Sequence, residues 1–96
     1  VVLFLEKRGF YCIRQFKVSD RGDRRTGRID IMAIHAQCGN LAIEIDWRSP
    51  RKKSVYKLNQ LGYARRLILL RKPWPHYQQG PTWFEYIKVI GLRPKI

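Results

Sequence analysis

The sequence predicts an α/β fold in which helices flank a mixed central β-sheet. Segments rich in aromatic and β-branched residues precede a helical pattern, and a short apolar run and an alternating segment follow it. Two strands separated by a helical crossover are typically parallel, whereas strands joined by a tight turn are antiparallel. We therefore expect one domain with the order helix, three strands, helix, strand, strand.

The first half of the chain is predicted to form a helix and three strands. Residues 1–8 end in basic residues that are followed by Gly9, a pattern typical of a helix C-terminus. A polar loop is expected over residues 19–27, and the turn at Cys38-Gly39-Asn40 joins two antiparallel strands. The three predicted strands are 10–18, 28–35 and 41–47.

The second half is predicted to add a helix, a buried strand and a final edge strand. Ser49 is a favoured N-cap residue and Pro50 suits the first helical position, so a helix is expected from there to about Ala64. Its inner side would carry Val55, Leu58 and Leu61. The remaining segments are a strand at 66–70, a Pro-rich loop at 72–82 and an alternating strand at 83–90.

The charge of the chain indicates a polyanionic partner. Twenty Lys and Arg against seven Asp and Glu give a formal net charge of +13, and the basic residues are spread over the whole length. Such a distribution suits a surface that follows the phosphates of DNA, although a merely solvated basic surface is the simpler alternative. No apolar run approaches the roughly 18 residues that a membrane span requires, so we expect a protein of the cytoplasm or nucleoid.

Three of the seven acids lie on two neighbouring predicted strands, 28–35 and 41–47, where a carboxylate is costly unless it is paired, protonated or bound to a cation. Glu44 and Asp46 point to the same face of one strand, and Asp30 lies on the neighbouring strand. Three such carboxylates offer the hard oxygen ligands that Mg²⁺ or Mn²⁺ prefers, and a bound cation can polarise a phosphodiester. The alternative is that Asp30 and Glu44 form ion pairs with Arg28, Arg48 or Lys53.

The spacing of these acids resembles the PD-(D/E)XK nuclease superfamily. Asp30 followed by Glu44-Ile45-Asp46 matches its acidic motif, and the segments 9–14, 27–33 and 41–44 look like those of archaeal Holliday junction resolvases and very-short-patch-repair-type endonucleases. The resemblance implies a restriction-endonuclease-like αβββαβ core over about residues 1–71. Residues 72–96 would add a Pro-rich loop and a C-terminal strand within the same single domain, 1–96.

The resemblance implies a Mg²⁺- or Mn²⁺-dependent endonuclease that hydrolyses DNA phosphodiester bonds, with a structure-specific, junction-resolving or repair-like preference. Asp30, Glu44 and Asp46 would hold the metal. The usual lysine two residues after the Glu is Asp46 here, so Lys52 or Lys53 would assist catalysis, or Asp46 would be a ligand or general base. The candidate catalytic residues are Asp30, Glu44, Asp46 and Lys53. The candidate nucleic-acid-binding residues are Ser19, Arg28, Arg48, Arg51, Lys52, Lys53 and Gln60.

Two other functions and one assembly state follow from the same residues. Loss of the motif lysine is compatible with a catalytically inactive DNA-binding module, and the basic charge is compatible with an RNA-binding protein whose acids form structural ion pairs. Cutting both strands of a duplex or junction takes two active sites. We therefore expect a homodimer, for which Trp74, Trp83 and Phe84 offer apolar surface.

Overall fold

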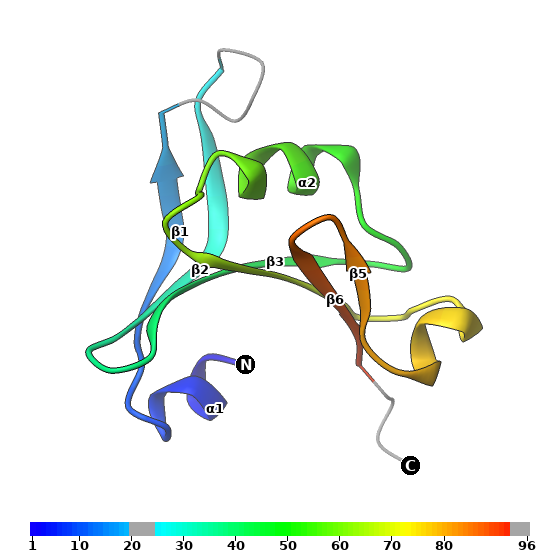
Figure 1. The fold of residues 1–96 in the computed structure, drawn as a ribbon, viewed down its shortest axis with the longest axis horizontal. Helices are drawn as coiled ribbons and strands as arrows, with labels where there is room; N and C mark the ends of the chain where they lie inside the picture. The colour runs from blue at the N-terminus through cyan, green and yellow to red at the C-terminus, as the bar shows by residue number, and fades with distance from the viewer. Residues whose placement is uncertain (20–24, 93–96) are drawn as a thin grey trace.

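A six-stranded mixed sheet with a helix on each face forms the body of the protein (Figure 1). The structure is a computed structural model that describes residues 1–19 and 25–92. Strands lie in the order β1-β2-β3-β4-β6-β5 across the sheet. The elements are α1 (Val2–Glu6), β1 (Tyr11–Val18), β2 (Gly27–His35), β3 (Gly39–Asp46), α2 (Lys52–Asn59), β4 (Arg65–Leu70), the 3-10 helix η1 (Pro75–Gln79), β5 (Thr82–Phe84) and β6 (Ile87–Gly91).

The connections of the sheet follow from the lengths of the segments between strands. β1, β2 and β3 are consecutive and antiparallel, with Ile13 opposite Met32 and Met32 opposite Ala42. α2 crosses over one face between β3 and β4, which are therefore parallel, and β4 and β6 are parallel as well. The sheet is thus antiparallel at both edges and parallel in its middle.

Two apolar clusters hold the helices against opposite faces of the sheet. The cluster under α2 contains Ile29, Met32, Leu58 and Ile68, each at most 1 % exposed. The cluster under α1 joins its one buried residue to the alternate side chains of the central strands. Its buried members are Leu5, Ile31, Ala33, Ile43 and Leu69. This alternation along β2 and β3 places the acidic side chains of β3 on the α2 face.

Most of the predicted elements are confirmed. The order helix, three strands, helix, strand is present, and the bounds of β1, β2, β3 and β4 lie within two residues of those expected. Val55 and Leu58 are buried on the inner side of α2, as its periodicity predicts, and Leu61 is buried just after the helix ends. The predicted loop over 19–27 includes residues 20–24, which lie outside the described residues. In the described part of the chain, no helix has the length and apolarity to cross a membrane.

The predicted start and end of the second helix are wrong. Lys52 is its first residue and Arg51 its N-cap, because the side chain of Asp46 accepts the Arg51 backbone N–H at 2.9 Å and so supplies the cap that Ser49 was expected to provide. α2 ends at Asn59, after which bonds from Gln60 and Leu61 to carbonyls three residues earlier tighten the chain into turns.

The predicted final strand at 83–90 is also wrong, because it is a hairpin of two strands. Trp83 pairs with Lys88 and Phe84 with Ile87 across a two-residue turn at Glu85-Tyr86, where Glu85 has a φ of 56°. Folding back leaves Ile87 and Val89 of β6 buried against β4 while the side chains of β5 are exposed. The apparent alternation across 83–90 therefore came from two strands with different burial.

Candidate active site

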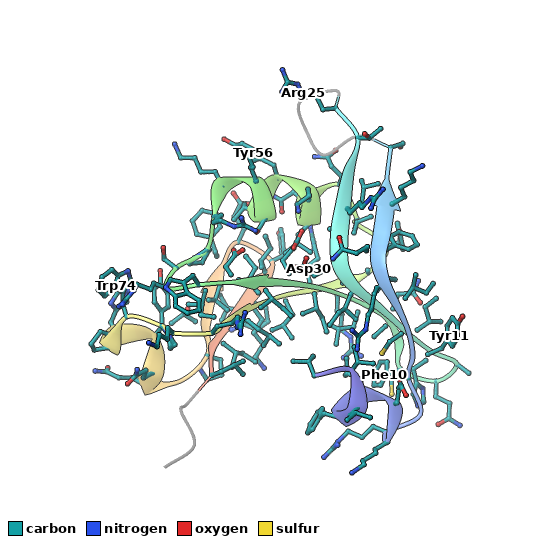
Figure 2. The ribbon with its side chains drawn as sticks, turned by 180° about the vertical axis from the view of Figure 1, so that it is seen from behind. Phe10, Tyr11, Arg25, Asp30, Tyr56 and Trp74 are labelled. Atoms are coloured by element: carbon teal, nitrogen blue, oxygen red, sulfur yellow. The ribbon has the colours of Figure 1, made fainter. Side chains whose placement is uncertain are left out.

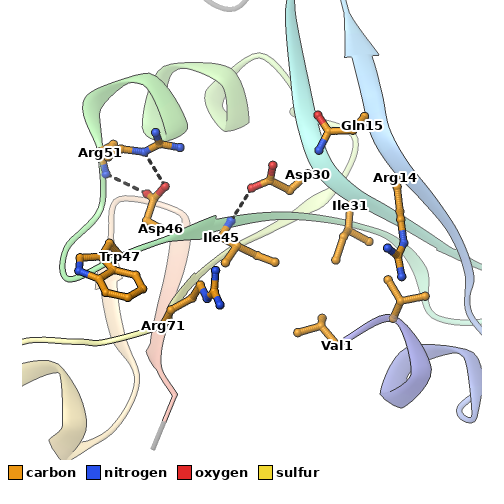
Figure 3. Close-up of a pocket in the computed structure, with 11 residues that line it drawn as sticks. Val1, Arg14, Gln15, Asp30, Ile31, Ile45, Asp46, Trp47, Arg51 and Arg71 are labelled. Atoms are coloured by element: carbon orange, nitrogen blue, oxygen red, sulfur yellow. Dashed lines mark hydrogen bonds and ion pairs between the residues drawn. The ribbon is translucent and has the colours of Figure 1, made fainter. Parts of the chain in front are cut away.

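β2 separates from β3 at Asp30. The β2–β3 ladder begins at the pair Ile31–Ile43, and Ile29 would face Ile45 if the same register continued. Instead, the Asp30 side chain takes this place, and its Oδ2 accepts the backbone N–H of Ile45 at 2.8 Å (Figure 3). Gln15, which lies opposite on β1, has a φ of 54°. A bend in two neighbouring strands thus brings a carboxylate to the edge of the β3 backbone.

Glu44 is a buried carboxyl group beside Asp30. Glu44 is 0 % exposed, and the Nζ of Lys57 on α2 lies 2.5 Å from the Glu44 Oε1. Neither carboxyl oxygen of Glu44 has a hydrogen bond of regular geometry. Lys57 also donates to the carbonyl of Arg28 at 2.9 Å, which fixes its ammonium between β2 and β3. Glu44 therefore lies in an apolar interior with one cation and few other polar partners.

The two neighbouring carboxyl groups have shifted pKa values of opposite sign. Burial and the adjacent Asp30 carboxyl raise the pKa of Glu44 to about 8, because both disfavour the charged form, and Lys57 only partly offsets them. Burial also acts to raise the pKa of Asp30, but contacts with Glu44, the Ile45 N–H and Lys57 outweigh it and lower that pKa. At neutral pH the pair thus holds one proton, on Glu44, and one negative charge, on Asp30.

Glu44 is expected to make the free energy of unfolding depend on pH. A carboxyl whose pKa rises from 4.5 to about 8 on folding stabilises the protein at low pH and loses that contribution as the pH rises between these values. In EDTA, Glu44→Gln should therefore be more stable than wild type above about pH 8, by about 1–3 kcal/mol. Urea unfolding at about pH 5 and pH 9 measures the free energy of unfolding of both proteins. A stability difference between Glu44→Gln and wild type that is the same at the two pH values would contradict this prediction.

Asp46 caps the helix α2 from the end of β3. Its residue is 3 % exposed. Oδ2 accepts the Arg51 N–H at 2.9 Å, and Oδ1 accepts the Arg51 Nε–H at 2.9 Å and the Ser54 hydroxyl at 2.8 Å. All three donors belong to the start of α2, so the geometry gives Asp46 a clear structural role.

A pocket of about 770 Å³ opens beside these acids. Asp30 and Asp46 contribute to its wall together with three guanidinium-bearing residues, Arg14, Arg51 and Arg71. Figure 3 shows Arg14 and Gln15 on one side of this pocket and Trp47 and Arg71 on the other, with Asp30 between them. The pocket therefore combines a carboxylate with several cations, an arrangement suited to a phosphate group whose charge must be held near an acid.

The predicted site residues are only partly brought together. Asp30 and Glu44 are adjacent, whereas Asp46 is directed to the start of α2. Lys52 and Lys53 are exposed on the first turn of α2. The other predicted nucleic-acid-binding residues are also exposed at their described positions, and these are Ser19, Arg28, Arg48, Arg51 and Gln60. Within residues 1–19 and 25–92, no three His, Cys, Asp or Glu side chains are grouped so that they could hold one metal ion.

Lys57 is the residue that the sequence analysis missed. It follows Ser54 by three positions on α2, and Ser54 is fully buried against Asp46. Residues three apart share a helix face, so the same periodicity that placed Val55 and Leu58 inside also places Lys57 near the sheet. Its distance of 13 positions from Glu44 matches no short motif, and helix geometry was the available signal.

Comparisons of this chain with family models, with curated proteins and with solved structures give no match. The arrangement of Asp30, Glu44 and Lys57 is therefore interpreted from its own geometry.

Proposed function

We propose that the protein is a metal-dependent endonuclease that hydrolyses DNA phosphodiester bonds. The observation that carries this proposal is the pair of adjacent carboxyl groups on Asp30 and Glu44, held beside the Lys57 ammonium where β2 leaves β3. Two like-charged groups side by side destabilise a sheet unless a cation or a proton compensates them. Such a pair is therefore better explained by a function than by a contribution to the stability of the fold.

The carboxyl groups fit a single divalent cation. Both Glu44 oxygens are buried and lack a hydrogen bond of regular geometry, with only the Lys57 ammonium beside Oε1, and a cation satisfies acceptors of this kind. Asp30, half-buried at the pocket wall, would contribute oxygen ligands from the open side. When bound, Mg²⁺ or Mn²⁺ would polarise a phosphodiester and lower the pKa of a coordinated water. Asp46 would contribute by holding the start of α2 in place. Its role as a metal ligand stays a prediction.

The remaining residues would bind and orient the DNA strand. Arg14, Arg51 and Arg71 surround Asp30 at the pocket, where they would hold backbone phosphates and offset the charge of the acids. Lys57 would stabilise the negative charge that develops on the phosphate during attack. Glu44 would release its proton when a cation binds, because metal ligands must be ionised.

The direct test is incubation of the whole chain with supercoiled plasmid, linear duplex and four-way junction DNA in Mg²⁺, Mn²⁺ or EDTA. We expect cleavage of at least one of these DNAs with Mg²⁺ or Mn²⁺ and none in EDTA. DNA binding without cleavage under every metal condition would favour the inactive DNA-binding module instead. The cap formed by Asp46 is the observation that favours this second function, because it removes one carboxylate from the predicted metal site.

Lys57 is expected to be the lysine on which cleavage depends. Lys57→Met should lower kcat by about 100-fold, because it removes a positive charge that would stabilise the transition state. Lys53→Met is the matched control, since Lys53 is exposed on the same helix. Plasmid nicking rates at saturating DNA measure the effect. A loss of kcat in Lys53→Met with Lys57→Met unaffected would restore Lys53 as the catalytic candidate.

Self-association remains a prediction for this fold. Trp74, Trp83 and Phe84 are 45 %, 65 % and 50 % exposed, as an apolar contact surface requires. Trp83 and Phe84 lie on β5, the short edge strand of the sheet, where a second copy would find unpaired backbone groups.

A further inference from the structure

The segments that follow β3 and β4 form one continuous surface at the end of the sheet. Arg71 N–H donates to the Asp46 carbonyl at 2.9 Å, Lys72 N–H to the Trp47 carbonyl at 2.8 Å, and Trp74 N–H to the Arg48 carbonyl at 3.2 Å. These three bonds extend the parallel ladder beyond the strands and hold the two segments together. We call this surface the tryptophan rim; its members are Trp47, Arg48, Arg71, Lys72 and Trp74.

The side chain of Trp47 is exposed beside the candidate active site. Its residue is 51 % exposed, although the side chain is large and mostly apolar. It lines the same pocket as Asp30 and Arg71 (Figure 3). The backbone bond from Lys72 fixes the Trp47 backbone on the rim and leaves the indole exposed. An exposed aromatic ring beside a candidate active site is suited to contact with a flat ligand group.

Cationic side chains surround both aromatic rings of the rim. Arg71 Cζ and Lys72 Nζ each lie 5.8 Å from the Trp47 ring centre, and Arg48 Cζ lies 4.6 Å from that of Trp74. An anionic chain that carries flat groups at regular intervals would match this alternation of rings and charges. Single-stranded nucleic acid has this chemistry, because its phosphates are anionic and its base faces are accessible.

We infer that Trp47 stacks on an unpaired base of DNA while Arg71 and Lys72 hold the neighbouring phosphates. In a duplex the base faces are already stacked on one another, so the ring would favour DNA with an unpaired nucleotide next to the scissile bond. This inference rests on the proposed function for the location of that bond, and it deepens the function by naming the substrate class. A DNA junction, flap or bubble presents such nucleotides, whereas an intact linear duplex does not.

Binding measured in EDTA tests the stacking separately from cleavage. Fluorescence anisotropy would compare a labelled single-stranded oligonucleotide with a duplex of equal length, using wild type, Trp47→Ala, Trp47→Phe and Tyr11→Ala. We expect Trp47→Ala to weaken binding of the single strand by about 10- to 100-fold and of the duplex by less than about 3-fold. Trp47→Phe should retain most of the affinity, because phenylalanine also offers an aromatic face.

Tyr11→Ala is the control for the loss of an exposed aromatic side chain. Tyr11 is 70 % exposed on β1, and Figure 2 shows it at the opposite end of the molecule from Trp74. The Tyr11→Ala variant should bind the single strand and the duplex with the affinities of wild type. Equal losses for single strand and duplex in Trp47→Ala, or no loss for either, would overturn the stacking inference. A Trp47-dependent preference for single strands in a protein that cleaves no DNA would support the stacking and reject the endonuclease.

Discussion

Replacement of Asp30 by asparagine is expected to lower Mg²⁺-dependent DNA cleavage by at least about 100-fold while DNA binding is kept. The substitution removes the charge that the proposed cation requires. It preserves an oxygen that can accept the Ile45 N–H, so the junction of β2 and β3 should remain intact. Nicking of supercoiled plasmid measures the cleavage, and anisotropy with labelled DNA in EDTA measures the binding. Binding should be unchanged or tighter, because a negative charge next to Arg14 and Arg51 is lost.

The matched control for this substitution is Glu85→Gln, which makes the same change of charge at an exposed turn between β5 and β6. It should cleave at the wild-type rate. Calorimetric titration with Mn²⁺ adds a readout that does not depend on activity, and the site seen in wild type should be absent from Asp30→Asn. If Asp30→Asn cleaves within about 3-fold of wild type, Asp30 is not a ligand of the catalytic cation and the proposed site is wrong.

Replacement of Asp46 by alanine is expected to destabilise the fold by about 2–4 kcal/mol. The substitution leaves the Arg51 N–H and the fully buried Ser54 hydroxyl without their acceptor, and it removes the partner of the Arg51 guanidinium. Denaturant unfolding followed by circular dichroism measures the loss. The effect is larger than for an ordinary surface ion pair, because the carboxylate itself is buried and accepts three hydrogen bonds.

Two further variants separate the capping role of Asp46 from a role in the chemistry. Glu6→Ala removes an exposed acid from α1 and should change the free energy of unfolding by less than about 0.5 kcal/mol. Asp46→Asn keeps one acceptor oxygen, so it should remain folded and cleave within about 10-fold of wild type. A folded Asp46→Asn protein without cleavage would show that Asp46 has the predicted role of a metal ligand or general base.

The framework of the sheet could be predicted because local patterns and burial agree there. β2 and β3 combine β-branched residues with a glycine-containing turn, and a single register buries Ile31 and Ile43 together. The hairpin of β5 and β6 could not be predicted, because Glu85 and Tyr86 are not typical turn residues. The turn forms because it lets Ile87 and Val89 of β6 pack beside β4. This contact is with a strand that lies far away in the sequence, so local patterns do not reveal it.

The candidate site could be predicted in part, because strand geometry fixes which acids can meet. Asp30 and Glu44 lie on adjacent strands and are adjacent in the structure. The alternation of side chains also correctly places Glu44 and Asp46 on one face, yet it does not reveal that Asp46 turns to the helix start. Helical spacing from Ser54 places Lys57 near the sheet, but the burial of Ser54 against Asp46 is visible only in the structure.

The cap that Asp46 provides has a consequence for the order in which the chain folds. α2 has only eight residues, with no acidic residue in its first turn and no cap from its own N-cap side chain. A helix of this length is marginal in isolation, since nucleation costs more than a few hydrogen bonds return. Its acceptor is supplied by the end of β3, so a persistent α2 needs the sheet to be in place before it. The segment that carries Lys57 therefore gains its structure only after the strand that carries Glu44, and the proposed site would be completed when α2 forms.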